Sequence, residues 1–81
     1  MVLYEVALYE KKQGLYSNAL DKFKEIMQLR PTMRLLLSAD MGICYYNLGD
    51  YHQALIYLND AKQSGEFIPE ALINTCEAKT K

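Results

Sequence analysis

The residues of this chain that could do acid–base or metal chemistry are few and scattered. The single histidine, His52, follows a Gly-Asp turn, where we expect it to be solvated, and it has no partners at the spacing of a zinc site. Asp21 and Glu25 share a helix face, but Lys22 and Lys24 surround them, which is typical of a solvated surface. The four glycines form neither a Gly-x-Gly-x-x-Gly cradle nor a P-loop for phosphate. The sequence therefore predicts a protein that is not an enzyme and needs no cofactor or metal.

The two cysteines, Cys44 and Cys76, stand far apart and have no CxxC spacing. Each lies in an apolar helical pattern, where free cysteine behaves as a small hydrophobic residue. We interpret both as reduced core thiols, because a disulfide would require the fold to bring them together. Disulfides are rare in the cytosol, so reduced thiols favour an intracellular, cytoplasmic location.

Composition and charge restrict the possible partners. The chain has 81 residues, of which 51% are hydrophobic and 23% charged, and its net charge is −1 at pH 7. This balance offers no basic surface for nucleic acid and no polybasic patch for a membrane. The apolar runs are far shorter than the roughly 20 residues that span a bilayer, and the first residues lack the basic region of a secretory signal. We expect one small domain that binds neither nucleic acid nor membrane.

Apolar residues recur at spacings of three and four, which is typical of amphipathic helices, and no alternating run indicates a strand. The joints carry glycines that can end a helix and polar residues that can cap the next one: Gly14, Ser17, Gly49, Asp50 and Gly65. A helix must end before Pro31, and Pro69 is favoured in the first turn of another. The sequence therefore predicts an all-α protein with helices over 2–13, 33–48, 51–63 and 69–80, and with a second helix that follows Ser17 as its N-cap and ends before Pro31.

The sequence also contains an internal repeat. The segments "QGLYSNAL" at 13–20 and "LGDYHQAL" at 48–55 share the pattern Gly-x-Tyr-x-x-Ala-Leu. A shift of thirty-five residues pairs identical or similar residues along two helices: Ala7 with Gly42, Gly14 with Gly49, Tyr16 with Tyr51, Ala19 with Ala54, Leu20 with Leu55, Phe23 with Leu58 and Gln28 with Gln63. A period in the thirties with two helices per unit is typical of a helical solenoid.

The repeated residues resemble the tetratricopeptide repeat (TPR) family. Its unit has a small residue in the first helix, an aromatic, a Gly-x-Tyr turn, an alanine at a helix crossing, a bulky residue, a second small residue and a closing proline. The matching positions are Ala7, Gly14, Tyr16, Ala19, Phe23 and Pro31 in the first unit and Gly42, Tyr45, Gly49, Tyr51, Ala54, Leu58 and Ala61 in the second. Glu10, Ile26 and Glu66 depart from the pattern, and the period is one residue longer than the family's 34.

The resemblance implies a right-handed α-α superhelix of about five antiparallel helices. One repeat would cover residues 1–33, a second 34–67, and a capping helix 69–80. In this family the first helix of each unit lines a concave groove that binds a peptide or helix of another protein. Carried over by position, the groove residues are Tyr4, Leu8, Lys11, Lys12, Leu36, Ala39, Ile43, Tyr46, Asn47 and Ile73, with Glu77 beside the last.

The character of this groove predicts the kind of partner. Its middle is apolar and aromatic, and aromatic residues commonly anchor binding hot spots, although Tyr4, Ile43 and Tyr46 could instead only pack against neighbouring helices. Lys11 and Lys12 give a weak indication of an acidic ligand. The carboxylate clamp for chaperone tails is not expected, because its positions hold Tyr4, Leu8, Asp40 and Glu70. An apolar or helical segment is the favoured ligand.

Two units and one helix are fewer than the roughly three repeats that a stable array needs. The last helix has a polar stripe suited to a cap, whereas the chain begins inside an apolar pattern. We expect a piece of a longer array or, alternatively, a second copy that covers this end. The sequence therefore predicts a non-enzymatic protein-interaction module, and the alternative is a self-assembly element that forms homo-oligomers through its apolar end and groove.

Overall fold

The computed structural model describes residues 2–81, and these residues form five α-helices and one short 3-10 helix. In chain order they are α1 (Val2–Lys12), α2 (Tyr16–Leu29), the 3-10 helix η1 (Pro31–Met33), α3 (Arg34–Leu48), α4 (Tyr51–Gln63) and α5 (Glu70–Lys79). The described residues contain no strand. The predicted all-α class is confirmed, and the five predicted helices are present, with ends within about two residues of the observed ones.

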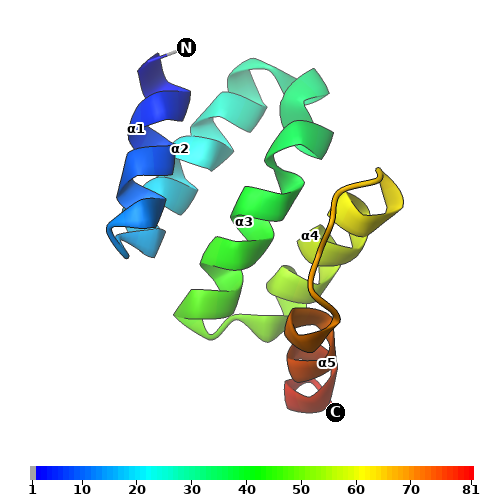
Figure 1. The fold of residues 1–81 in the computed structure, drawn as a ribbon. Helices are drawn as coiled ribbons and strands as arrows, with labels where there is room; N and C mark the ends of the chain where they lie inside the picture. Colours follow the sequence, from blue (N-terminus) through cyan, green and yellow to red (C-terminus); the bar gives the residue numbers. More distant parts are fainter. Residues whose placement is uncertain (1) are drawn as a thin grey trace.

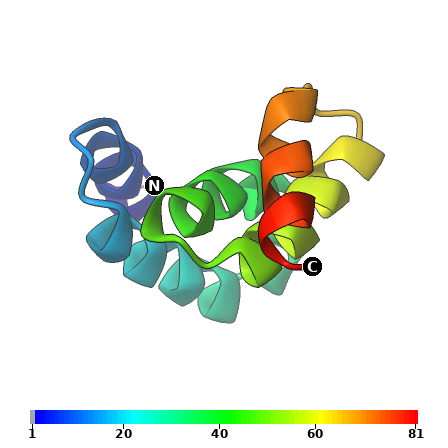
Figure 2. The ribbon, with the colours of Figure 1, turned by 90° about the horizontal axis from the view of Figure 1, so that it is seen from below.

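Each helix packs against the next one along the chain. Successive helices run in opposite directions, so α1 with α2 and α3 with α4 form two hairpins, and α5 follows beside α4 (Figure 1). Seen from below, α1 and α5 lie toward opposite ends of the molecule with α3 between them (Figure 2). The result is an elongated body of 36 × 25 × 19 Å. Among residues 2–81, no helix has the length and apolar character needed to cross a membrane.

Three helix ends share one backbone geometry, and each contains a glycine. Gly14, Gly49 and Gly65 have φ values of 82°, 85° and 96°, a left-handed conformation that glycine adopts without steric cost. In each case the next residue donates its N–H to the carbonyl five positions back: Leu15 to Glu10 at 2.8 Å, Asp50 to Tyr45 at 3.0 Å and Glu66 to Ala61 at 3.0 Å. The first two joints occupy equivalent positions of the sequence repeat, so the repeat is also a repeat of backbone structure.

The two predicted N-caps have different outcomes. Asp50 caps α4 as predicted, because its side chain accepts a hydrogen bond from the backbone N–H of Gln53 at 3.4 Å. The prediction for Ser17 is wrong: α2 begins at Tyr16, Leu15 holds the N-cap position, and Ser17 lies within the first turn. The turn at Gly14 sets this register, and it places Leu15 where the second joint has Asp50.

One continuous apolar core runs through the helices. Repeat-related positions are buried in pairs: Ala7 with Gly42, Ala19 with Ala54, Phe23 with Leu58 and Ile26 with Ala61. Cys44 and Cys76 are also fully buried and unbonded to one another, so their interpretation as free core thiols is confirmed. Tyr57 and Ile68 are core residues that the helical pattern did not identify.

Candidate functional site

The described residues offer little to a small ligand. Residues 2–81 enclose no pocket, and within them no three His, Cys, Asp or Glu side chains gather as metal ligands would. His52, Asp21 and Glu25 are exposed to solvent.

The buried thiols are poor candidates for nucleophiles. Burial raises the pKa of the Cys44 thiol to about 11, while nearby Lys11 lowers it and Asp40 raises it by smaller amounts. Burial also raises the pKa of Cys76. Because the thiolate is the reactive form of cysteine, both residues are protonated and unreactive at neutral pH.

The ten predicted groove residues differ in how much surface they offer. Six of them are half-buried, three on α1 and three on α3: Tyr4, Leu8, Lys11, Ala39, Ile43 and Tyr46. Three are exposed: Lys12, Leu36 and Asn47. Ile73 is only 6% exposed and belongs to the core beside Cys76, so it has almost no surface to give a partner. We call the six half-buried residues of α1 and α3 the inner-surface row.

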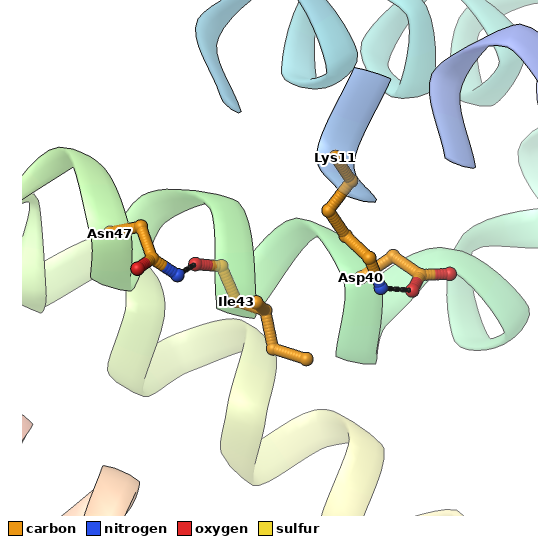
Figure 3. Close-up of polar contacts among 4 residues, drawn as sticks. All are labelled: Lys11, Asp40, Ile43 and Asn47. Atoms are coloured by element: carbon orange, nitrogen blue, oxygen red, sulfur yellow. Dashed lines mark hydrogen bonds and ion pairs between the residues drawn. The ribbon is translucent and has the colours of Figure 1, made fainter. Parts of the chain in front are cut away.

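An ion pair ties the two helices of this row together. The Lys11 ammonium of α1 lies 2.5 Å from the carboxylate of Asp40 on α3, and both side chains are largely buried (Figure 3). This contact joins the first hairpin to the second. It also neutralises the charge of Lys11, which weakens the sequence-based indication of an acidic ligand.

Tyr4 has a structural role as well as exposed surface. Its ring lies 6.3 Å from that of Phe23 on α2, in an edge-to-face arrangement. Burial is the main cause that raises the pKa of the Tyr4 hydroxyl, and the Asp40 and Glu66 carboxylates raise it further while Lys11 lowers it. Tyr4 is therefore neutral over the physiological range and offers a hydroxyl donor beside an apolar ring.

At the other end of α3, Tyr46 and Asn47 are already engaged. The ring of Tyr46 meets that of Tyr51 at 5.8 Å, nearly perpendicular to it. The Asn47 amide donates to the backbone carbonyl of Ile43 at 2.8 Å, one turn earlier in the same helix (Figure 3). Ile43, between the ion pair and this amide, presents an aliphatic side chain to the surface. The Ile43 side chain is half-buried and takes part in none of these polar or aromatic contacts.

The structure explains why Glu10 departs from the repeat pattern. Glu10 lies 2.7 Å from Lys22 and links α1 to α2. Thirty-five residues later, Tyr45 and Tyr57 hold the same two positions and stack at 5.6 Å with an interplanar angle of 12°. An ion pair in the first unit therefore takes the place of an aromatic pair in the second. Lys24 of α2 lies over the ring of Tyr45 at 5.6 Å. This cation–π contact is a second link between the two hairpins.

Several exposed apolar side chains were not identified from the sequence. Phe67, 88% exposed, stands next to the buried Ile68 in the segment between α4 and α5. Val2 and Tyr9 of α1 are 75% and 63% exposed. Helical periodicity could not separate these residues from core residues, because it does not report whether another helix covers a given face. Comparison with the second unit would not have identified Val2 and Tyr9 either, because the equivalent residues Leu37 and Cys44 are fully buried.

Comparison of this chain with protein-family models, curated proteins and solved structures finds no match.

Proposed function

We propose that this chain is a non-enzymatic protein-interaction module of the tetratricopeptide type. In this proposal its helices form a right-handed superhelix of two repeats, over 1–33 and 34–67, with the helix over 69–80 as a cap. The module binds a peptide or helical segment of another protein on the inner-surface row, as part of a larger scaffold. The observation that carries the proposal is this row, in which five of the six side chains are apolar or aromatic, on the first helices of two units with equivalent joints.

The row favours an apolar ligand over an acidic one. Tyr4, Leu8, Ile43 and Tyr46 keep part of their apolar surface in water, and covering such surface stabilises a complex by about 25 cal/mol per Å². Lys11 is held by Asp40, so a carboxylate of the ligand would have to compete with an existing ion pair. Free buried thiols support a cytoplasmic location for this interaction.

A selection from random peptides tests the proposal in the absence of the natural partner. The chain is immobilised and used to select from a phage-displayed library. We expect enriched peptides with apolar residues at helical spacing, and Ile43→Glu should weaken their binding by about tenfold or more. Ile56→Glu, at a residue of α4 that is 49% exposed, is the matched control and should bind normally. Absence of enrichment, or equal binding by the Ile43→Glu variant, would contradict the proposal.

The alternative proposal is self-assembly through the apolar end and the same row. The exposure of Val2 and Tyr9 on α1 favours it. Light scattering coupled to size exclusion separates the two proposals. For a module that binds a foreign partner, we expect a monomer at all concentrations, and Ile43→Glu should leave the mass unchanged. For a self-assembling element, a larger species should form and Ile43→Glu should dissociate it.

A further inference from the structure

The outward side of α1 carries an apolar stripe that none of the other described helices covers. It consists of Val2, Val6 and Tyr9, which are 75%, 38% and 63% exposed. Their spacings of four and three residues place them on one face of the helix. We call these three residues the α1 stripe.

The same positions in the second unit are fully buried. Thirty-five residues later the stripe becomes Leu37, Met41 and Cys44 on α3, and each of these is 0% exposed. Two contacts show what covers that side of α3. On one flank Asp40 binds Lys11 of α1, and on the other Tyr45 receives Lys24 of α2. The stripe of α3 therefore faces the first hairpin, and the α1 stripe is the same surface without a hairpin in front of it.

The first hairpin shows which kinds of side chain pack against such a stripe. Because Lys24 of α2 reaches Tyr45 on α3, its helical neighbours Leu20 and Met27 share the side of α2 that faces α3. Leu20 is buried and Met27 half-buried. The covering face is thus a pair of long aliphatic side chains with a lysine between them.

The charge pattern around the α1 stripe fits the same type of cover. Glu5 occupies the position equivalent to Asp40, and it is exposed where Asp40 is held by Lys11. A basic residue of an incoming helix would find at Glu5 the carboxylate that Lys11 finds at Asp40. The α1 stripe therefore has both the apolar surface and the acidic flank of the observed interface between the two hairpins.

We propose that the α1 stripe is a docking surface for an amphipathic helix of another protein, whose contact face has the chemistry of α2: aliphatic residues seven apart with a basic residue between them. A second copy of the chain fits less well. In each copy α3 already packs against α2, and α5 packs against α4 and places Glu70 2.9 Å from Lys62, which is equivalent to Met27 of α2. This surface lies apart from Ile43 and Tyr46, so the inference does not depend on the peptide-binding proposal.

The test uses α2 itself as the reference ligand. The peptide has the sequence of residues 16–30. Because an isolated helix of this length is marginal in water, it is stapled between the residues that replace Ser17 and Asp21, both of which are exposed in α2. It is titrated into the 15N-labelled 81-residue chain. We expect saturable shifts of the amide signals of α1 around Val6 and Tyr9, with a dissociation constant below about 1 mM.

Matched variants make the result specific. Val6→Glu in the chain, and Lys24→Glu in the peptide, should each weaken binding by about tenfold, whereas Ile56→Glu in the chain should not change it. Circular dichroism checks that Val6→Glu folds, and Tyr9→Glu replaces it if it does not. No shifts up to about 1 mM peptide, or shifts centred on α3 or α5, would overturn the proposal. So would a concentration-dependent dimer that Val6→Glu dissociates, because the occupant would then be a second copy.

Discussion

The size of a single side chain sets the distance between α3 and α4. Gly42 on α3 faces Leu58 on α4 so closely that an added Cβ would lie 2.8 Å from Leu58 Cγ and 3.1 Å from its backbone nitrogen. The equivalent position of the first unit holds Ala7, which is fully buried. A methyl group is therefore accommodated at this position of the first unit, whereas at Gly42 it would press against Leu58.

Gly42→Ala is expected to destabilise the protein. Alanine gains roughly 1 kcal/mol of helix propensity over glycine, but forced contacts in a packed core cost about 1–3 kcal/mol, and here the backbone of α4 limits the relaxation. We expect a net loss of about 1 kcal/mol in the free energy of unfolding, measured by urea denaturation. An increase in stability would show that α4 moves away without cost.

Among the elements, the joints between helices show most directly how local sequence sets local structure. The two equivalent joints have the same glycine conformation and the same hydrogen bond five residues back. They differ at the next position, which is Leu15 before α2 and the capping residue Asp50 before α4. The start of α4 therefore has a side-chain cap, while α2 relies on packing of its apolar face.

Two alanine substitutions test this difference between the joints. Asp50→Ala removes the acceptor for the Gln53 N–H, and we expect a loss of about 0.5–1 kcal/mol, at the low end for N-caps because the bond is long. Ser17→Ala should change the free energy of unfolding by less than about 0.5 kcal/mol, since Ser17 is an exposed residue within α2. Urea denaturation of both variants measures the two values. A larger loss for Ser17→Ala would show that the Ser17 side chain caps α2 in solution, contrary to this structure.

At the scale of the whole molecule, the two hairpins share one core. The buried cluster is continuous from α1 to α5, and the Lys11–Asp40 pair and the Lys24–Tyr45 contact join the units. A chain of this size buries too little apolar surface for two independent cores. The hairpins should therefore unfold together.

Ile26→Val tests this cooperativity. Ile26 is fully buried in α2, and loss of one methylene should cost about 0.5–1.5 kcal/mol. If the hairpins unfold together, amide hydrogen exchange in α4 should lose protection by the same free energy. Ile56→Val, at an exposed site of α4, is the control and should change little. Unchanged exchange in α4 of the Ile26→Val variant would mean that the second hairpin is stable by itself.

Local sequence patterns were enough to predict the all-α class, the five helices and the glycine ends of three of them. Helical periodicity and the left-handed glycine ends depend on residues within one or two turns of each other, so a local pattern is enough to predict them. The internal repeat was equally visible, because identical joints need the same residues at the same spacing.

Which helix faces are covered could not be predicted from these patterns and follows from the packing of the helices. The stripe that is buried on α3 is exposed on α1, Ile73 of the predicted groove lies in the core, and Lys11 is bound to Asp40 instead of standing free. Glu10, a departure from the repeat pattern in the sequence, is matched by Lys22 across the hairpin. The physical reason is that burial and pairing depend on the neighbouring helix that packs against a face, and this neighbour is distant in sequence.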